Sequence, residues 1–144
     1  MAAVLSAATP AQRFMLDTNM ASFLIRGSSA PLKARLLAVP MAQMCVSAVT
    51  QGELLYGLAR RPGASALHTA VRELLVRLDV LPWDSAASAR YGPLRALLER
   101  LGTPLGNLDT LIAAHALAAD AVLVTNDHAF RRVEGLLVED WTVA

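Results

Sequence analysis

Short apolar runs alternate with longer helical patterns along this chain. Residues 14–16 form an apolar run that ends at Asp17, and residues 44–49, 121–125 and 136–138 form three further runs. Continuous apolar runs of this length are typical of strands that are covered on both faces. We therefore predict four buried strands, with a brief additional strand near residues 80–83.

The segments between these runs carry apolar residues at helical spacing. The clearest case runs from Leu67 to Leu78, where apolar side chains recur every three or four residues. Helix-start and helix-stop residues bound the other predicted helices. Thr18-Asn19 caps a first helix that Gly27 ends, and Pro31 lies in the first turn of a second helix. A helix that begins after the run at residues 44–49 ends at Arg60 to Gly63, and another begins at Asp84-Ser85 with a break near Gly92-Pro93. Asn107 caps a last helix that reaches Ala119.

Strands separated by helices predict an α/β fold with right-handed crossovers, a mostly parallel sheet and helices on both faces. A length of 144 residues is typical of one compact domain, which we place at residues 13–144. Residues 1–12 read as an N-terminal extension without the basic start and long apolar centre of a signal peptide. No apolar stretch reaches the roughly 20 residues that span a bilayer, so a cytoplasmic protein without a membrane partner is expected.

The composition of the chain predicts a protein interface and excludes a disulfide framework. The chain is 55% hydrophobic, above the usual share of about half, and the surplus predicts an oligomer or partner surface. A net charge of +1 does not by itself demand nucleic acid. Cys45 is the only cysteine and lies in an apolar run, which indicates a core thiol and excludes a disulfide framework.

Four acidic residues lie near the ends of the predicted strands. Asp17 ends the first strand, Glu53 lies shortly beyond the second, and Asp127 follows the third clear strand. Asp109 lies in the first turn of the helix that precedes that third strand, where the helix dipole favours a carboxylate. In an open parallel sheet the functional crevice lies outside the carboxyl ends of the strands. If the first and third clear strands are neighbours, all four side chains converge there.

Four converging carboxylates predict a metal-dependent hydrolase. They repel one another unless cations neutralise them, and an oxygen-only ligand set selects Mg²⁺ or Mn²⁺ over zinc. Such an ion activates water and stabilises a leaving oxygen in phosphodiester hydrolysis. No G-x-x-x-x-G-K-[ST] loop is present. Nearby polar residues that can orient waters or carboxylates are Thr18, Asn19, Thr125 and Asn126.

Each candidate also has a structural interpretation. Asp17 and Asp127 fit turns or caps, Glu53 fits a solvated helix face, and Asp109 fits a dipole partner. His115, among alanines, fits a hydrogen-bonded core histidine better than a metal ligand. Trp83 and Trp141 fit packing anchors better than base-stacking platforms. Four arginines fit either solvated charges or RNA phosphate contacts: Arg60, Arg61, Arg131 and Arg132.

Five sequence blocks occur in an order that resembles a known family. They are Phe-Met-Leu-Asp-Thr-Asn, Ser-Ala-Val-Thr-Gln-Gly-Glu-Leu-Leu-Tyr-Gly, Leu-Pro-Trp-Asp, Gly-Asn-Leu-Asp-Thr-Leu-Ile-Ala-Ala-His-Ala and Val-Thr-Asn-Asp, which begin at residues 14, 47, 81, 106 and 124. Together they resemble PIN-domain proteins of the VapC toxin type, from about Phe14 to Trp141. The N-terminal dozen residues lie outside this resemblance.

The resemblance implies a PIN-like three-layer α/β/α sandwich and a Mg²⁺- or Mn²⁺-dependent endoribonuclease that cuts RNA, often tRNA or rRNA. It assigns the catalytic and metal-binding roles to Asp17, Glu53, Asp109 and Asp127. It also implies a homodimer neutralised by a VapB-like antitoxin, with DNA contacted only through that antitoxin. Many relatives carry a further acid where this chain has Ala129, which makes Asp127 the least secure ligand.

Two other functions remain open at this point. One is a PIN-like module that binds RNA or protein without cutting, favoured by Ala129 and by the lack of an obvious basic groove. The other is a phosphatase or DNA nuclease that uses the same acidic site. Cleavage assays with RNA, DNA and EDTA separate the three.

Overall fold

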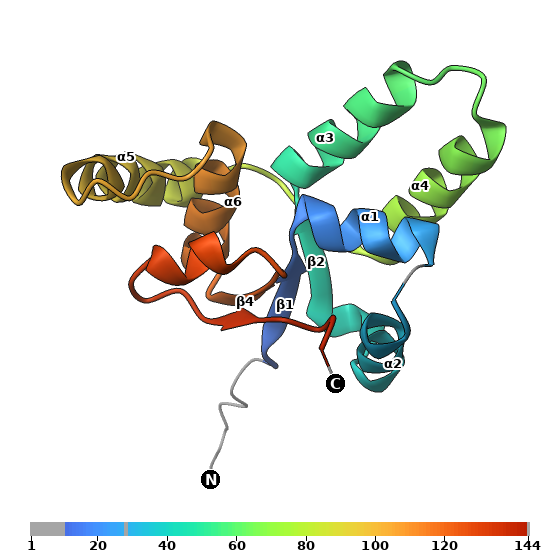
Figure 1. Ribbon diagram of the computed structural model, residues 1–144, viewed down its shortest axis with the longest axis horizontal. Helices are drawn as coiled ribbons and strands as arrows, with labels where there is room; N and C mark the ends of the chain where they lie inside the picture. The colour runs from blue at the N-terminus through green and yellow to red at the C-terminus, as the bar shows by residue number, and fades with distance from the viewer. Residues whose placement is uncertain (1–10, 28, 144) are drawn as a thin grey trace, which may run out of the picture.

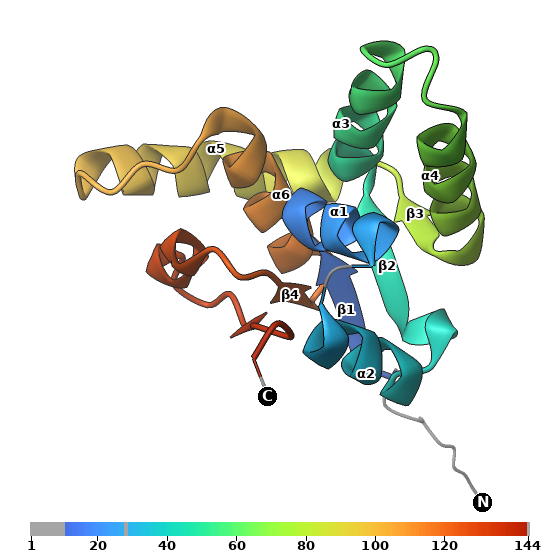
Figure 2. The same cartoon turned by 45° about the vertical axis from the view of Figure 1, so that its right-hand side comes forward.

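The protein forms one five-stranded parallel sheet. The computed structural model describes residues 11–27 and 29–143, so the predicted extension at residues 1–12 lies outside the described residues except for its last two. The strand order is β3-β2-β1-β4-β5, and every pairing is parallel (Figures 1 and 2). The first and third clear strands, β1 and β4, are neighbours, which was the condition for the candidate acids to approach one another. The strands are β1 Arg13–Leu16, β2 Met44–Ser47, β3 Asp79–Leu81, β4 Ala121–Val124 and β5 Val138–Glu139.

Successive residues of each central strand face opposite sides of the sheet. Met15 packs with Cys45 and Leu123 in one core cluster, while the next residue, Leu16, packs with Val46 in another. Side chains of a strand alternate between faces, so both faces must be apolar when both are covered. This explains the continuous apolar runs, and it confirms Cys45 as a core thiol, whose pKa burial raises to about 11.

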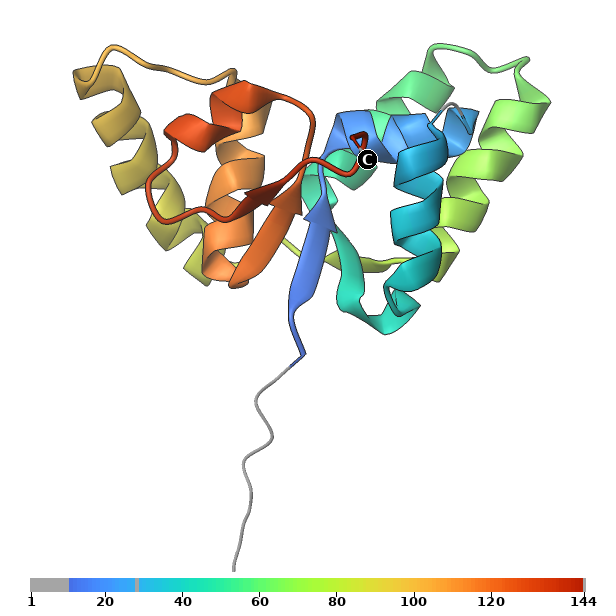
Figure 3. The same ribbon diagram turned by 60° about the horizontal axis from the view of Figure 1, so that its bottom comes forward.

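Helices cover both faces of the sheet (Figure 3). Helices α5 (Ser85–Arg100) and α6 (Asn107–Ala118) pack on the face of Met15, and α1 (Thr18–Arg26) and α2 (Ala30–Ala38) pack on the face of Leu16. Helices α3 (Ala48–Ala59) and α4 (Ser65–Arg77) pack on α1 through a third cluster. Two 3₁₀ turns, η1 (Met41–Gln43) and η2 (His128–Arg132), complete the described elements. The predicted α/β/α sandwich is confirmed. No helix among the described residues combines the length and apolar character that crossing a membrane requires.

Two helix starts differ from the prediction. The cap of α1 is Asp17 rather than Thr18-Asn19, because the Asp17 carboxylate accepts a hydrogen bond from Met20 N at 2.8 Å. Helix α6 begins at Asn107 itself and its cap is Gly106, without a side-chain cap bond. Gly27 ends α1 with φ of 65°, as predicted, because the left-handed conformation favours glycine.

The predicted break near Gly92-Pro93 is absent, because Pro93 lies inside one continuous α5. Proline removes one backbone hydrogen bond, but Leu94 and Leu98 are buried beside α6, and this packing outweighs the loss. Strand β2 ends two residues earlier than predicted, because Ser47 Oγ accepts from Val49 N and starts α3. Strand β5 is Val138–Glu139 rather than 136–138.

Trp141 anchors the C-terminal segment, as the packing interpretation predicted. Its side chain is fully buried, and its ring centroid lies 5.3 Å from that of Phe14. The indole N–H donates to Glu139 Oε1 at 2.9 Å, and the Arg35 guanidinium lies 5.2 Å from the ring centroid. One side chain therefore joins the end of the chain to β1 and α2.

We predict that Trp141→Ala lowers the free energy of unfolding by about 3–5 kcal/mol, the usual effect of removing a buried tryptophan. Urea denaturation followed by circular dichroism measures this. Val143→Ala is the matched control, since Val143 is 60% exposed two residues away, and a change within about 0.5 kcal/mol is expected. A loss below about 1 kcal/mol for Trp141→Ala would contradict the anchoring role.

Candidate active site

The sheet topology gathers the candidate acids at one edge. Chain order runs from β1 to β2 on one side and returns to β4 on the other, so β1 and β4 form the switch point of the sheet. Ligand sites of open parallel sheets lie at the carboxyl ends of strands at such a point. Asp17 directly follows β1, and Thr125 directly follows β4. The Asp17 backbone N–H also donates to Val124 O at 3.1 Å, which ties the two strand ends together.

Asp17 is the most deeply buried acid of the site, with 3% of its surface exposed. Its pKa is raised from 3.8 to about 6, mainly by burial and to a smaller extent by the nearby charges of Asp109 and Asp127. Hydrogen bonds from Thr125 and from the Met20 backbone act in the opposite direction. Asp17 is therefore a carboxylate whose negative charge is poorly solvated near neutral pH.

Glu53 enters the site from the second turn of α3. Its Oε1 accepts a hydrogen bond from the Thr18 hydroxyl, and the Thr18 hydroxyl also lies 3.2 Å from that of Thr50. Thr50 is fully buried, so this hydroxyl pair fixes where the Glu53 carboxylate points. The sequence identified Thr18 as a supporting residue and missed Thr50, whose one-turn spacing from Glu53 was the available signal.

Asp109 reaches the same region because α6 runs back across the sheet towards β4. Its first turn therefore lies at the edge where the strands end, and a carboxylate there is favoured by the helix dipole. The carboxylate lies over Gly106, since a Cβ at Gly106 would stand 3.8 Å from Asp109 Oδ2. Burial raises the pKa of Asp109, and the charges of Asp127 and Glu53 add to that rise.

Asp127 lies in the turn after β4. Its Oδ1 accepts from Ala129 N at 2.9 Å, and its own N–H donates to Thr125 Oγ1 at 3.0 Å. Thr125 thus contacts both Asp17 and the Asp127 backbone. Ala129, where many relatives were expected to carry an acid, contributes a backbone donor and no carboxylate.

The four acids are electrostatically coupled, although their oxygens are not gathered into one cage. Asp127 raises the pKa of both Asp17 and Asp109, and Glu53 raises that of Asp109. Within residues 11–27 and 29–143, no three His, Cys, Asp or Glu side chains lie close enough to hold one metal ion together. The arrangement is a region of concentrated negative charge with oxygen-only donors.

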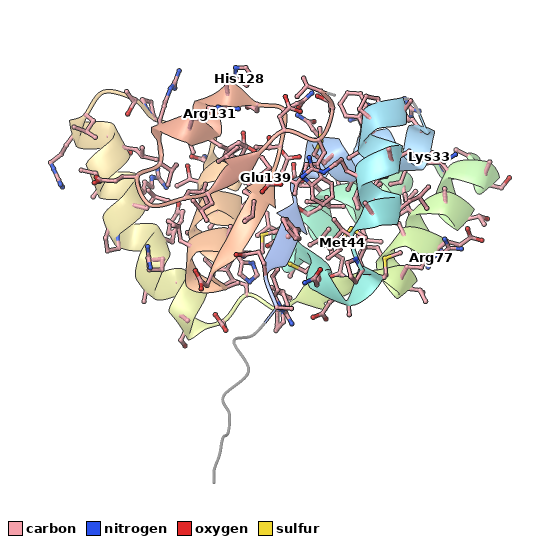
Figure 4. All side chains as sticks on the ribbon, turned by 90° about the horizontal axis from the view of Figure 1, so that it is seen from below. Lys33, Met44, Arg77, His128, Arg131 and Glu139 are labelled. Atoms are coloured by element: carbon pink, nitrogen blue, oxygen red, sulfur yellow. The ribbon has the colours of Figure 1, made fainter. Side chains whose placement is uncertain are left out.

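The remaining candidate residues divide into those near the acids and those outside. Asn126 is half-buried next to Asp127, whereas Asn19 is exposed. Arg131 and Arg132 are exposed on η2. Figure 4 shows His128 and Arg131 at the top of the view, left of centre, and Lys33 and Arg77 on the right.

A buried contact between His115 and Ser47 joins the two helices that carry Asp109 and Glu53. His115 is 3% exposed, and its Nδ1 lies 2.7 Å from Ser47 Oγ, the cap of α3. Its ring packs edge-on against Trp83 at 5.4 Å between centroids. Burial lowers the pKa of His115. The interpretation of His115 as a hydrogen-bonded core residue is therefore confirmed, and it joins α6, which carries Asp109, to the start of α3.

Two hollows lie on the side of the molecule that carries α1 and α4. One, which we call the arginine cleft, lies between α1, α3 and α4 and has a volume of about 330 Å³. Its polar lining includes Thr18, Glu53, Arg26, Arg60 and Arg61, and Gly57 and several apolar side chains line it as well. The other, the apolar groove, also measures about 330 Å³ and lies between α1, α2 and α4. Lys33, Met44 and Arg77 line the apolar groove (Figure 4), and none of the four acids does.

Comparison with known proteins identifies the family. The sequence profile of the PIN domain matches residues 14–136. The tRNA(fMet)-specific endonuclease VapC of Shigella flexneri is 38% identical over 131 residues, which cover 90% of this chain and 98% of that protein.

Solved structures give the same result. The DNA-bound VapBC of Salmonella typhimurium superposes with a TM-score of 0.84 at 37% identity, covering 90% of this chain and 98% of that one. VapBC2 of Rickettsia felis, bound to a DNA fragment from its promoter, gives a TM-score of 0.82 at 30% identity over 89% and 98% of the two chains. This chain belongs to the PIN-domain family and, within it, to the VapC type.

Proposed function

We propose that this chain is an endoribonuclease that hydrolyses RNA phosphodiester bonds at the acidic site with Mg²⁺ or Mn²⁺, and that it acts as the toxin of a toxin–antitoxin pair. One observation carries the proposal. Four acids from separate parts of the chain lie around the carboxyl ends of β1 and β4, and burial together with the neighbouring acids raises the pKa of Asp17 and of Asp109. Relatives that share the family over nearly the whole chain are named endonucleases or ribonucleases.

The donor chemistry fits a hard divalent cation. All four side chains offer only carboxylate oxygens, the donors that Mg²⁺ and Mn²⁺ prefer. Asp17 is buried, and the ion pairs found among the described residues involve other acids. Asp17 and Asp109 would hold the cation, with Glu53 and Asp127 completing the site. A bound cation of this kind lowers the pKa of water and stabilises charge on phosphate oxygens.

Hydroxyl groups and the start of α6 orient the acids of this site. The Thr18 hydroxyl holds the Glu53 carboxylate, and Thr125 donates to Asp17. The first turn of α6 presents Asp109, whose raised pKa in the metal-free protein reflects burial and the neighbouring acids, and a bound cation would relieve that cost. In the net reaction a water oxygen bonds to phosphorus, the bond from phosphorus to the leaving oxygen breaks, and that oxygen takes a proton.

The substrate and the protein partner follow from the relatives and from the surface. The relatives of 37–38% identity are named tRNA(fMet)-specific endonucleases, so tRNA is the first RNA to test.

An antitoxin is supported by the structural relatives, which are VapBC complexes. Its contact surface would include the apolar groove, where Leu37 is 83% exposed, because exposed apolar patches mark interfaces. The homodimer stays a prediction.

We predict that the purified protein cleaves tRNA in the presence of Mg²⁺ or Mn²⁺ and not in EDTA. Asp17→Asn and Asp109→Asn should each lower kcat/KM by more than about 100-fold, because loss of even the outer partners of a metal site lowers activity 10- to 100-fold. Glu134→Gln, an exposed acid, is the control. Activity that survives EDTA or Asp17→Asn would exclude the metal-site mechanism. RNA binding without cleavage would favour a module that binds RNA and does not cut it. Equal cleavage of RNA and DNA would favour a general nuclease.

We predict that Asp17→Asn stabilises the metal-free protein at pH 7.5. The folded pKa of about 6 exceeds the unfolded value of 3.8, so stability present below pH 3.8 is lost as pH rises through about 6. The full difference corresponds to about 3 kcal/mol. Asparagine keeps the cap of α1, so the gain at pH 7.5 should approach that figure and largely vanish at pH 4. Urea denaturation in EDTA measures it, and a gain no larger than that of Glu134→Gln would refute the prediction.

We predict that expression of the chain alone arrests bacterial growth and that Asp109→Asn relieves the arrest. Co-expression of the antitoxin, sought in the adjacent reading frame, should restore growth. Leu37→Asp should weaken that rescue while leaving tRNA cleavage unchanged, because it places a charge in the apolar groove. Val76→Asp is the matched control, since Val76 is 85% exposed on α4 outside the groove. Equal rescue of both variants would exclude the groove as the antitoxin surface.

A further inference from the structure

The arginine cleft is continuous with the acidic site. Thr18 and Glu53, which belong to the acidic site, also line the cleft. Arg26 comes from the last turn of α1, and Arg60 and Arg61 come from the end of α3. One hollow is therefore lined by the Glu53 carboxylate of the acidic site and by three guanidinium groups, with apolar side chains between them.

The positive charge of this cleft is not neutralised by carboxylates. Arg26 lies over the Phe23 ring at 5.1 Å, and Arg60 lies over the Tyr56 ring at 5.6 Å. The ion pairs found among the described residues involve other arginines. An aromatic ring holds a guanidinium in place without cancelling its charge, and the planar fork of arginine matches phosphate oxygens.

Helix dipoles explain part of this arrangement but not all of it. A cation near the C-terminus of a helix is favoured by the dipole, which accounts individually for Arg26 in the last turn of α1 and for Arg60 at the C-cap of α3. The dipole does not require that arginines from two helices border one cleft, nor that this cleft opens on the acids. The joint placement indicates an anionic ligand that extends from the acidic site.

We propose that the arginine cleft binds the phosphate backbone of the RNA next to the bond that is cut. This rests on the proposed ribonuclease function and extends it from the reacting phosphate to its neighbours. Glu53 and Arg60 are seven residues apart on α3, or about 10 Å along the helix axis. The RNA strand therefore runs from the acids along α3 to the arginines.

Gly57 gives the strand room to pass. It lies between Glu53 and Arg60, it lines the cleft, and a Cβ placed on it would meet nothing within 4 Å. Glycine inside a helix is unfavourable by about 0.5–1 kcal/mol relative to alanine. Gly57 lies in the last turn of α3, and its presence there is explained if a side chain would obstruct the ligand.

The first test removes charge from the cleft. Arg26→Gln, Arg60→Gln and Arg61→Gln should each weaken binding of a fluorescent RNA of about 12 nucleotides to the metal-free protein by about 3- to 10-fold, with a salt slope shallower by about 0.7. In Mg²⁺ each should raise KM for tRNA with kcat within about twofold. Arg72→Gln, an exposed arginine of α4 outside the cleft, should change neither.

The second test fills the cleft without removing charge. Gly57→Leu should weaken RNA binding about tenfold or more while the protein keeps or gains thermal stability, because leucine favours the helix. Gly52→Leu is the matched control, since Gly52 also lies inside α3 with open space at its Cβ but does not line the cleft. Loss of RNA binding with raised stability separates obstruction from misfolding.

The outcomes separate this proposal from the proposed function. If the wild type cuts tRNA but Gly57→Leu and the arginine variants bind RNA normally, the cleft proposal is wrong and the ribonuclease assignment stands. If these variants lose antitoxin affinity and keep RNA affinity, the cleft is a protein site and the proposal is overturned. If the wild type binds RNA through the cleft but cuts no RNA with any metal, the cleavage assignment fails instead.

Discussion

Burial of the Asp17 carboxylate beside other acids is the constraint on which the rest of this structure depends. Asp17 ends β1, caps α1 and lies beside β4, so its position is fixed by backbone hydrogen bonds on both sides. It cannot move into water without disrupting β1 and α1 together. Its charge, with those of Asp109 and Asp127, must be tolerated where it lies or be neutralised by something that binds.

The surrounding residues make that tolerance possible. Thr125 donates to Asp17, Thr18 donates to Glu53, and the first turn of α6 favours Asp109. Behind them, the contact between His115 and Ser47 joins α6 to α3. These contacts orient the acids without cancelling their charge. The metal-free protein is therefore less stable than it would be without these acids, and the same uncancelled charge allows the site to bind a cation.

Charge is separated along one continuous surface. The net charge of +1 conceals this separation, because carboxylates gather at the strand ends while Arg26, Arg60 and Arg61 border the adjoining cleft. The apolar groove shares Ile25 with the arginine cleft but contains none of the four acids, and it carries exposed apolar side chains such as Leu37. A polyanion and a protein partner would therefore bind to neighbouring surfaces of different chemistry on this molecule.

The sequence by itself predicted the buried strands, the order of helices and strands along the chain, and a set of candidate acids, because buried parallel strands require continuous apolar runs and side-chain chemistry is local. Tertiary structure decided what depends on packing and distant contacts. It kept α5 intact through Pro93 because α6 covers its buried face, and it made Asp17 the cap of α1. It also paired Thr50 with Thr18 and brought Arg26 into one cleft with Arg60. Such pairings join residues tens of positions apart, and no local pattern encodes them because they arise only when the two faces of the sheet are covered.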